Sequence, residues 1–100
     1  MKPVDYIRNQ IWFMKDNDLQ MPEFLMFGAI LIAAKEQREV NVTDLMKIYG
    51  VNSPASNHRY ITSLLSKDMI EFKHKGRDRR TKYVLPTRTG LKKFTATFGE

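Results

Sequence analysis

The apolar residues near the start of the chain recur every three or four positions. This spacing predicts an amphipathic helix over residues 3–16. The apolar stripe consists of Val4, Ile7, Ile11 and Met14, and three aromatic residues widen it, namely Tyr6, Trp12 and Phe13. The apolar side of this helix is therefore wider than a single core requires.

A second helix is expected from Pro22 to Gln37. The preceding segment Asp16-Asn17-Asp18 has the composition of a turn, and proline is favoured at the first position of a helix. Apolar residues then occur nearly all round the helix. A helix of this kind is buried from more than one side, either by the rest of its own domain or by a second subunit.

A short polar helix is expected next. After a stub of strand at residues 39–42, Thr43 can cap a helix over residues 44–49. Gly50 is expected to end this helix, because glycine accepts the left-handed backbone that a helix stop requires.

The following helix is expected over residues 54–67. Ser53 can cap its first turn, and Pro54 supplies a preset first helical position. Because about four residues separate this helix from the preceding one, the two helices must cross steeply, which is typical of a helix-turn-helix. Its inward side combines Pro54 and Asn57 with three apolar residues, Ile61, Leu64 and Leu65.

The rest of the chain predicts a hairpin and a last helix. Residues 69–74 and 81–85 alternate as strands on either side of a polar, glycine-containing turn at residues 75–80. We expect Ile70, Phe72, Tyr83 and Leu85 to face the core, and Lys73, Lys75 and Lys82 to face water. Thr87 then opens a helix over residues 88–98, with Leu91, Phe94 and Phe98 on one side. These elements predict one domain over residues 1–100 that is mainly α with a small β-hairpin (α+β), a winged helix-turn-helix.

The net charge of +6 is concentrated in the second half of the chain. Residues 1–52 hold six Lys or Arg and seven Asp or Glu, whereas residues 53–100 hold eleven and four. Such a one-sided run next to strand-like sequence favours contact with a polyanion over a merely solvated face. The candidate wing contacts are Lys73, Lys75, Arg77, Arg79, Arg80 and Lys82.

The outward face of the 54–67 helix carries small polar residues around one arginine. Small side chains allow a close approach to a DNA groove, and an arginine can reach paired acceptors on guanine or a phosphate. Taken alone, this pattern fits a solvated helix face equally well. The candidate recognition residues are Asn52, Ser53, Ala55, Ser56, Arg59, Tyr60 and Ser63.

Other kinds of chemistry find no support in the sequence. The chain has no cysteine, and its two histidines, His58 and His74, have no partner at metal-ligand spacing. No phosphate-binding loop or nucleophile motif is present, so we predict no enzyme activity, no cofactor and no metal. The longest apolar stretch is about half of what a membrane span requires, and no secretory signal precedes it. We therefore expect a cytoplasmic, nucleoid-associated protein.

From Asp44 to Gly90 the sequence resembles the MarR family of winged-helix regulators. Leu64 followed by Met69-Ile70 is similar to the way that family's recognition helix leads into its wing. Gly76-Arg77-Asp78-Arg79-Arg80 resembles the family's Asp-Arg-Arg wing motif, and the segment from Leu85 to Gly90 resembles the Leu-Thr-x-x-Gly that closes the wing. The sequence departs from the pattern at Asp68, where the family has glycine, and at Pro86, where it has an aliphatic residue.

The resemblance implies a sequence-specific double-stranded DNA-binding protein, with a transcriptional repressor favoured over an activator. The alternatives are a winged-helix module for protein interaction and an accessory factor for replication or packaging. The resemblance does not extend to the long C-terminal helices that frame the family's ligand pocket, so it leaves open whether a small-molecule effector regulates this protein.

The excess of apolar residues predicts a homodimer. Helices 3–16 and 88–98 are the candidate dimerisation elements. The alternative is that these terminal helices cover the central one within a monomer.

Overall fold

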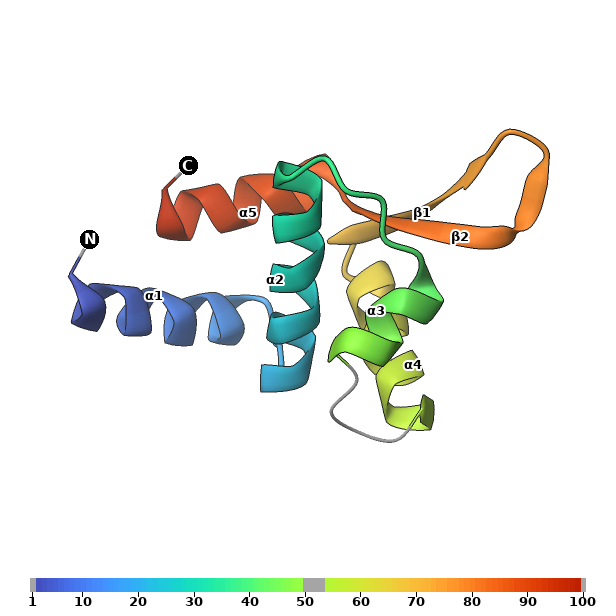
Figure 1. Cartoon of the computed structure of the whole chain (residues 1–100). Helices are drawn as coiled ribbons and strands as arrows, with labels where there is room; N and C mark the ends of the chain where they lie inside the picture. Colours follow the sequence, from blue (N-terminus) through green and yellow to red (C-terminus); the bar gives the residue numbers. More distant parts are fainter. Residues whose placement is uncertain (1, 50–53, 100) are drawn as a thin grey trace.

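The computed structural model describes residues 2–49 and 54–99, apart from the side chains of residues 48, 49, 54, 55, 78 and 79. The described elements are α1 (Pro3–Asp16), α2 (Met21–Lys35), α3 (Val42–Tyr49), α4 (Pro54–Ser66), β1 (Ile70–Lys75), β2 (Asp78–Pro86) and α5 (Arg88–Phe98). They confirm the predicted winged helix-turn-helix (Figure 1). Gly50 and Ser53, predicted as the stop of one helix and the cap of the next, lie outside the described residues.

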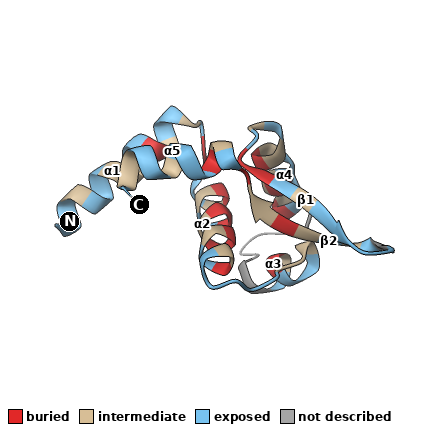
Figure 2. Ribbon diagram, turned by 90° about the horizontal axis from the view of Figure 1, so that it is seen from above, coloured by how far each residue is buried: buried red, intermediate tan, exposed pale blue. Residues whose placement is uncertain are grey.

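Helix α2 stands at the centre of the molecule. Figure 1 shows α1 and α5 side by side to its left, and α3, α4 and the hairpin to its right. The fully buried side chains include Phe27, Ile30 and Leu64, and Figure 2 shows that buried residues gather around α2 and the parts of α4 and β1 nearest to it. The tip of the hairpin and the start of α1 are exposed (Figure 2).

Helix α3 begins earlier than its sequence predicts. The side-chain Oδ1 of Asn41 accepts a hydrogen bond from the backbone N–H of Asp44 at 2.7 Å, and the backbone N–H of Leu45 bonds to the Asn41 carbonyl at 3.0 Å. Asn41 is therefore the N-cap, and the prediction that Thr43 caps this helix is wrong. Asparagine is at least as good an N-cap as threonine, and it stands three residues before the N–H that it binds.

The structure confirms the predicted inward residues of β1, Ile70 and Phe72, but not those of β2. The antiparallel register pairs Ile70 with Pro86 and Phe72 with Val84. Because directly paired residues project from the same side of a sheet, Val84 joins Ile70 in the core. The prediction that Tyr83 and Leu85 share this face is wrong, since they pair with Lys73 and Glu71 on the other side.

Six aromatic rings join the terminal helices to α2. Phe13 is fully buried, and its ring centroid lies within about 6 Å of the rings of Phe24, Phe27, Phe94 and Phe98. Tyr6 extends the cluster, with its ring 5.3 Å from that of Phe98. Aromatic pairs at these separations contribute beyond their buried area. The inward side of α1 therefore centres on Phe13, with Tyr6 at its edge, whereas Trp12 is 55% exposed.

The aliphatic stripe of α1 consequently points outward. Val4, Ile7 and Ile11 are 65%, 57% and 49% exposed, because Phe13 projects from the opposite side of the helix. The sequence correctly predicted a helix with an apolar surface wider than one core requires.

None of the described helices is long and apolar enough to cross a membrane.

Three helices end in the same way. After α1, α2 and α4, a residue with positive φ turns the chain, and its own N–H and the N–H of the next residue bond back to carbonyls of the last helical turn. This is the Schellman arrangement, in which glycine is the usual residue. Here the positions are held by Asp18, Gln37 and Asp68, with φ of 52°, 57° and 58°. Asp68 thus occupies a left-handed position, at the place where the MarR family, which the sequence resembles, has glycine.

The start of α5 is packed directly against the residue that precedes β1. Thr87 caps α5 by accepting a hydrogen bond from the Gly90 N–H at 2.9 Å, and its own N–H bonds to the Met69 carbonyl at 3.0 Å. A Cβ on Gly90 would lie 2.4 Å from that carbonyl oxygen. Only glycine permits this approach, because the atom in the way belongs to the backbone.

We predict that Gly90→Ala destabilises the fold by about 1–3 kcal/mol, since the added methyl group must displace the Met69 backbone. Gly28→Ala is the matched control. A Cβ at Gly28 in α2 meets nothing within 4 Å, so alanine should stabilise the helix by up to about 1 kcal/mol. Urea unfolding of both variants measures the difference. Equal stability of the two variants would show that the contact at Met69 imposes no constraint.

Candidate nucleic-acid interface

Helix α4 is anchored to the core along one side. Ile61 and Leu64 are buried, and Asn57 is buried beside them. Leu65 and Tyr60 are partly buried against the same core. This is the inward side that the sequence predicts, so the opposite side of α4 is presented outward.

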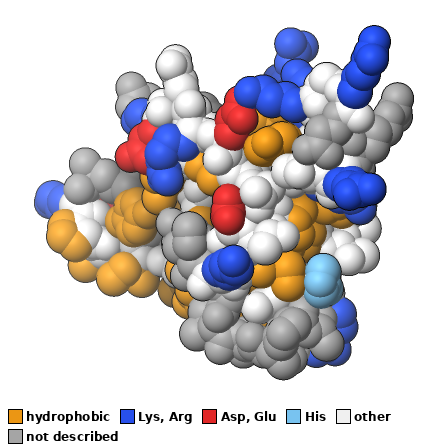
Figure 3. Space-filling view, turned by 45° about the vertical axis from the view of Figure 1, so that its right-hand side comes forward, with side chains coloured by type: hydrophobic (Ala, Val, Ile, Leu, Met, Phe, Trp, Pro, Cys, Tyr) orange, Lys and Arg blue, Asp and Glu red, His pale blue; other side chains and the backbone are white. Residues whose placement is uncertain are grey.

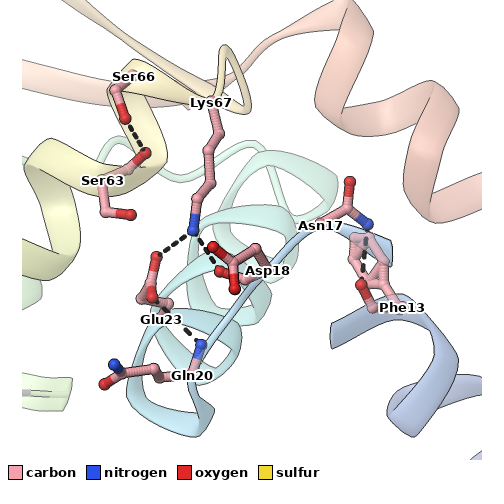
Figure 4. A network of polar contacts seen from close by, with 8 residues as sticks. All are labelled: Phe13, Asn17, Asp18, Gln20, Glu23, Ser63, Ser66 and Lys67. Carbon is pink, nitrogen blue, oxygen red and sulfur yellow. Dashed lines mark hydrogen bonds and ion pairs between the residues drawn. The ribbon is translucent and has the colours of Figure 1, made fainter. Parts of the chain in front are cut away.

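The end of α4 is held by a buried ion pair. Lys67 follows the helix, and its Nζ lies 3.2 Å from Oε2 of Glu23, whose side chain is only 5% exposed. Lys67 also donates to the backbone carbonyl of Asp18. The other carboxylate oxygen of Glu23 accepts the Gln20 N–H at 3.2 Å, which closes a capping box at the start of α2 (Figure 4). One lysine thus joins α4 to the α1–α2 turn.

The outward face of α4 centres on Arg59. Its side chain is exposed, and one guanidinium nitrogen donates to the Ser56 hydroxyl at 3.2 Å. This i, i+3 contact holds the guanidinium close to the helix surface without burying it. Thr62 and His58 are also exposed on α4. Of the other candidate recognition residues, Asn52 and Ser53 lie outside the described residues, and Ala55 is described only as backbone within α4.

Tyr60 and Ser63 are directed toward α2. Together with Arg59 they line a pocket of about 260 Å³ whose other wall is formed by Gln20 and Glu23 at the start of α2. Both residues are half-buried. The structure therefore places Ser56 on the outward surface, Tyr60 and Ser63 at the junction with α2, and Arg59, which is exposed, between the two.

The hairpin presents several basic side chains on its surface. Lys73, Lys75, Arg77, Arg80 and Lys82 are all exposed, and the side chain of Arg79 is not among those described. Figure 3 shows Lys and Arg side chains gathered at the upper right, over the hairpin, whereas hydrophobic side chains gather on the left. The predicted positive wing is therefore present as an exposed surface.

Two of these lysines have partners within the chain. Lys75 forms an ion pair with Glu39 in the α2–α3 connection, and the hydrogen bond and negative charge of Glu39 raise the pKa of the Lys75 ammonium. The Nζ of Lys82 lies 5.4 Å from the centre of the Phe72 ring, a cation–π geometry. The charge of Lys75 is therefore partly offset by Glu39.

An irregularity in the hairpin gathers the basic residues of β2. Lys73 pairs with Tyr83 and Lys75 pairs with Asp78, so that one residue of β1 faces the four residues 79–82 of β2. An excess of residues on one strand bends it and redirects its side chains. The bulged segment contains Arg79, Arg80 and Lys82. Its position could not be read from the sequence, which predicts a six-residue turn instead.

Sequence reasoning missed Glu23 and Lys67. Both were placed in their helices, but nothing in the local pattern pairs residues 44 positions apart. A buried glutamate within an otherwise apolar helix was the available signal, because an unpaired buried carboxylate is rare.

We predict that Lys67→Met destabilises the fold by roughly 1–3 kcal/mol, because the Glu23 carboxylate stays buried without its cation. The double variant Glu23→Gln, Lys67→Met should recover part of this loss, since it leaves no buried charge. Lys35→Met, at the exposed end of α2, is the control and should change stability little. Urea unfolding distinguishes the variants, and strictly additive losses would contradict the coupling.

Comparison of the sequence with models of protein families and with curated protein sequences finds no match. Similar structures are known. S. aureus MepR in complex with DNA superposes with a TM-score of 0.72 at 18% identity, over 91% of this chain and 71% of that one. A mutant E. coli MarR with operator DNA superposes with a TM-score of 0.67 at 21% sequence identity, over 92% of this chain and 64% of that one. A Peptoclostridium difficile MarR protein superposes with a TM-score of 0.65 at 22% sequence identity, over 93% of this chain and 56% of that one.

This chain thus spans less than two thirds of the length of two of these proteins. It has the winged-helix fold of the MarR and MepR regulators, as the resemblance of its hairpin and flanking residues implied.

Proposed function

We propose that this chain binds double-stranded DNA sequence-specifically and regulates transcription as a repressor. The observation that carries the proposal is the pairing of an exposed arginine face on α4 with a basic hairpin, both on the side of α2 away from α1 and α5 (Figure 1). Two structures with the same fold are described as DNA complexes. Such a regulator acts in the cytoplasm, at chromosomal DNA.

In this proposal α4 lies in the major groove and the hairpin follows the backbone or the minor groove. Arg59 reads a base edge, with Ser56 as its neighbour on the outward face. The neighbouring candidates Asn52, Ser53 and Ala55 flank them, and Tyr60 and Ser63 border the same helix. The wing residues Lys73, Arg77, Arg79, Arg80 and Lys82 neutralise phosphates, and Lys75 contributes less because Glu39 shares its charge.

We predict that base discrimination and general affinity can be separated by mutation. Arg59→Ala should relax the preference at one or two base positions, because a bidentate arginine–guanine contact is worth about 1–3 kcal/mol. Replacing Arg77, Arg79 and Arg80 together by Gln should weaken binding to all duplexes alike. It should also reduce the slope of log affinity against log salt concentration by nearly one unit per lost phosphate contact.

Selection from a random duplex pool, followed by titration at several salt concentrations, measures both effects, and each variant is the control for the other. No enrichment with the parent protein would refute specific DNA binding. A basic surface that bound only acidic proteins would point to an interaction module instead.

We further propose that the protein acts as a homodimer through α1 and α5. The stripe of Val4, Ile7 and Ile11 lies opposite the aromatic side that packs within the chain. A groove of about 600 Å³ continues it, lined by Ile7, Ile11, Met14, Leu19 and Met21 among others. Contiguous exposed apolar surface usually marks an interface, and a two-fold pair is the commonest way to cover one.

The expected result is a dimer in sedimentation equilibrium at micromolar concentration. Ile7→Glu with Ile11→Glu should give a folded monomer, because both side chains are about half exposed and do not belong to the buried core. Two recognition helices in a dimer would read half-sites about 34 Å apart, so the selected site should be near-palindromic. A parent protein of single-chain mass, with or without DNA, would refute the dimer.

A further inference from the structure

A small polar pocket lies between the start of α3 and the base of the wing. It is lined by Asn41, Val42 and Thr43 on one side and by Arg80, Thr81 and Lys82 on the other, and its volume is about 160 Å³. The pocket joins two parts of the proposed DNA-binding surface that are separate in the sequence.

Backbone contacts fix the two walls relative to each other. Asn41 forms an isolated antiparallel bridge with Tyr83, and the Val84 N–H bonds to the Val40 carbonyl at 2.9 Å. The segment before α3 therefore runs along the outer edge of β2. The ion pair between Glu39 and Lys75 adds a third connection between this segment and the hairpin.

The lining residues are donors and cations. Arg80 and Lys82 supply two positive charges, and none of the six lining residues is acidic. Asn41 uses its Oδ1 to accept from the Asp44 N–H, which leaves the donor end of its amide directed elsewhere. Thr43 is exposed and adds a hydroxyl. Guanidinium, ammonium and hydroxyl donors around one small space suit a tetrahedral oxyanion.

We propose that this pocket holds one backbone phosphate of the bound duplex, so that the first helix of the helix-turn-helix and the wing grip the same strand at a single point. This inference rests on the proposed DNA binding and adds Asn41 and Thr43 to its contacts. Cations at the exposed tip, such as Arg77, contribute attraction along the backbone. The pocket instead fixes the register of the protein on DNA, since its walls are tied together.

The test uses the duplex selected by the parent protein, substituted with one neutral methylphosphonate at a time. One position in each half-site should lose about tenfold in affinity for the parent protein, the loss expected for a charge-assisted hydrogen bond. For the variant Thr43→Val, Lys82→Met, the same substitution should cost clearly less affinity than it costs the parent protein, because two donors are gone and Arg80 remains, whereas the other sensitive positions keep their losses. Lys93→Met, exposed on α5, is the charge control and should retain the parent pattern.

The outcomes separate the two proposals. If the parent protein binds no duplex, the proposed function fails. If it binds and the double variant keeps every methylphosphonate sensitivity, the pocket is not a phosphate contact, although DNA binding stands. Thermal unfolding of the double variant checks that both exposed substitutions leave the fold intact.

Inorganic phosphate could occupy the same donors. Its addition to the DNA-free protein, followed through the amide resonances of Val42 and Thr43, should give only weak, millimolar binding. Saturation well below millimolar concentration would overturn the assignment to DNA and identify a site for a small anion.

Discussion

The orientation of α4 is constrained by one buried carboxylate. Glu23 accepts hydrogen bonds from the Gln20 N–H and the Lys67 ammonium, and Lys67 also binds the carbonyl of Asp18. The α1–α2 turn, the first turn of α2 and the end of α4 therefore meet at one point. Because a buried charge tolerates few geometries, this contact fixes α4 against α2 more narrowly than the surrounding apolar packing can. The hairpin and α5 follow directly in the chain, so their positions depend on it as well.

The sequence predicted the elements well because each has a local cause. Apolar spacing defined α1, α2 and α5, and the resemblance around Gly76 and Gly90 correctly implied the fold. Apart from the N-cap of α3, which is local, the misplaced details depend on contacts between distant segments. The wing register follows from the pairing of Phe72 with Val84, and the outward stripe of α1 follows from the packing of Phe13 against α5.

Candidate site residues could be predicted by type more readily than by placement. The exposed cations of the wing and the position of Arg59 follow from charge and helical periodicity. The division of the α4 residues between the outward face and the junction with α2 does not, since the direction of Tyr60 and Ser63 is set by where Gln20 and Glu23 lie. Lys75 looked equivalent to Lys73 in the sequence and differs only because Glu39 lies beside it in space.

The bulge in β2 separates the hairpin into two parts with different freedom. Below it, the pairs from Ile70–Pro86 to Lys73–Tyr83 are held by the core and by the contact between Thr87 and Met69. Above it, the four residues 79–82 already face a single residue of β1. Residues can therefore be inserted or deleted at the tip, around Gly76 and Arg77, without displacing α5 or the core. The length of the wing is an adjustable dimension of this fold, and the reach of its basic tip can change while the framework stays the same.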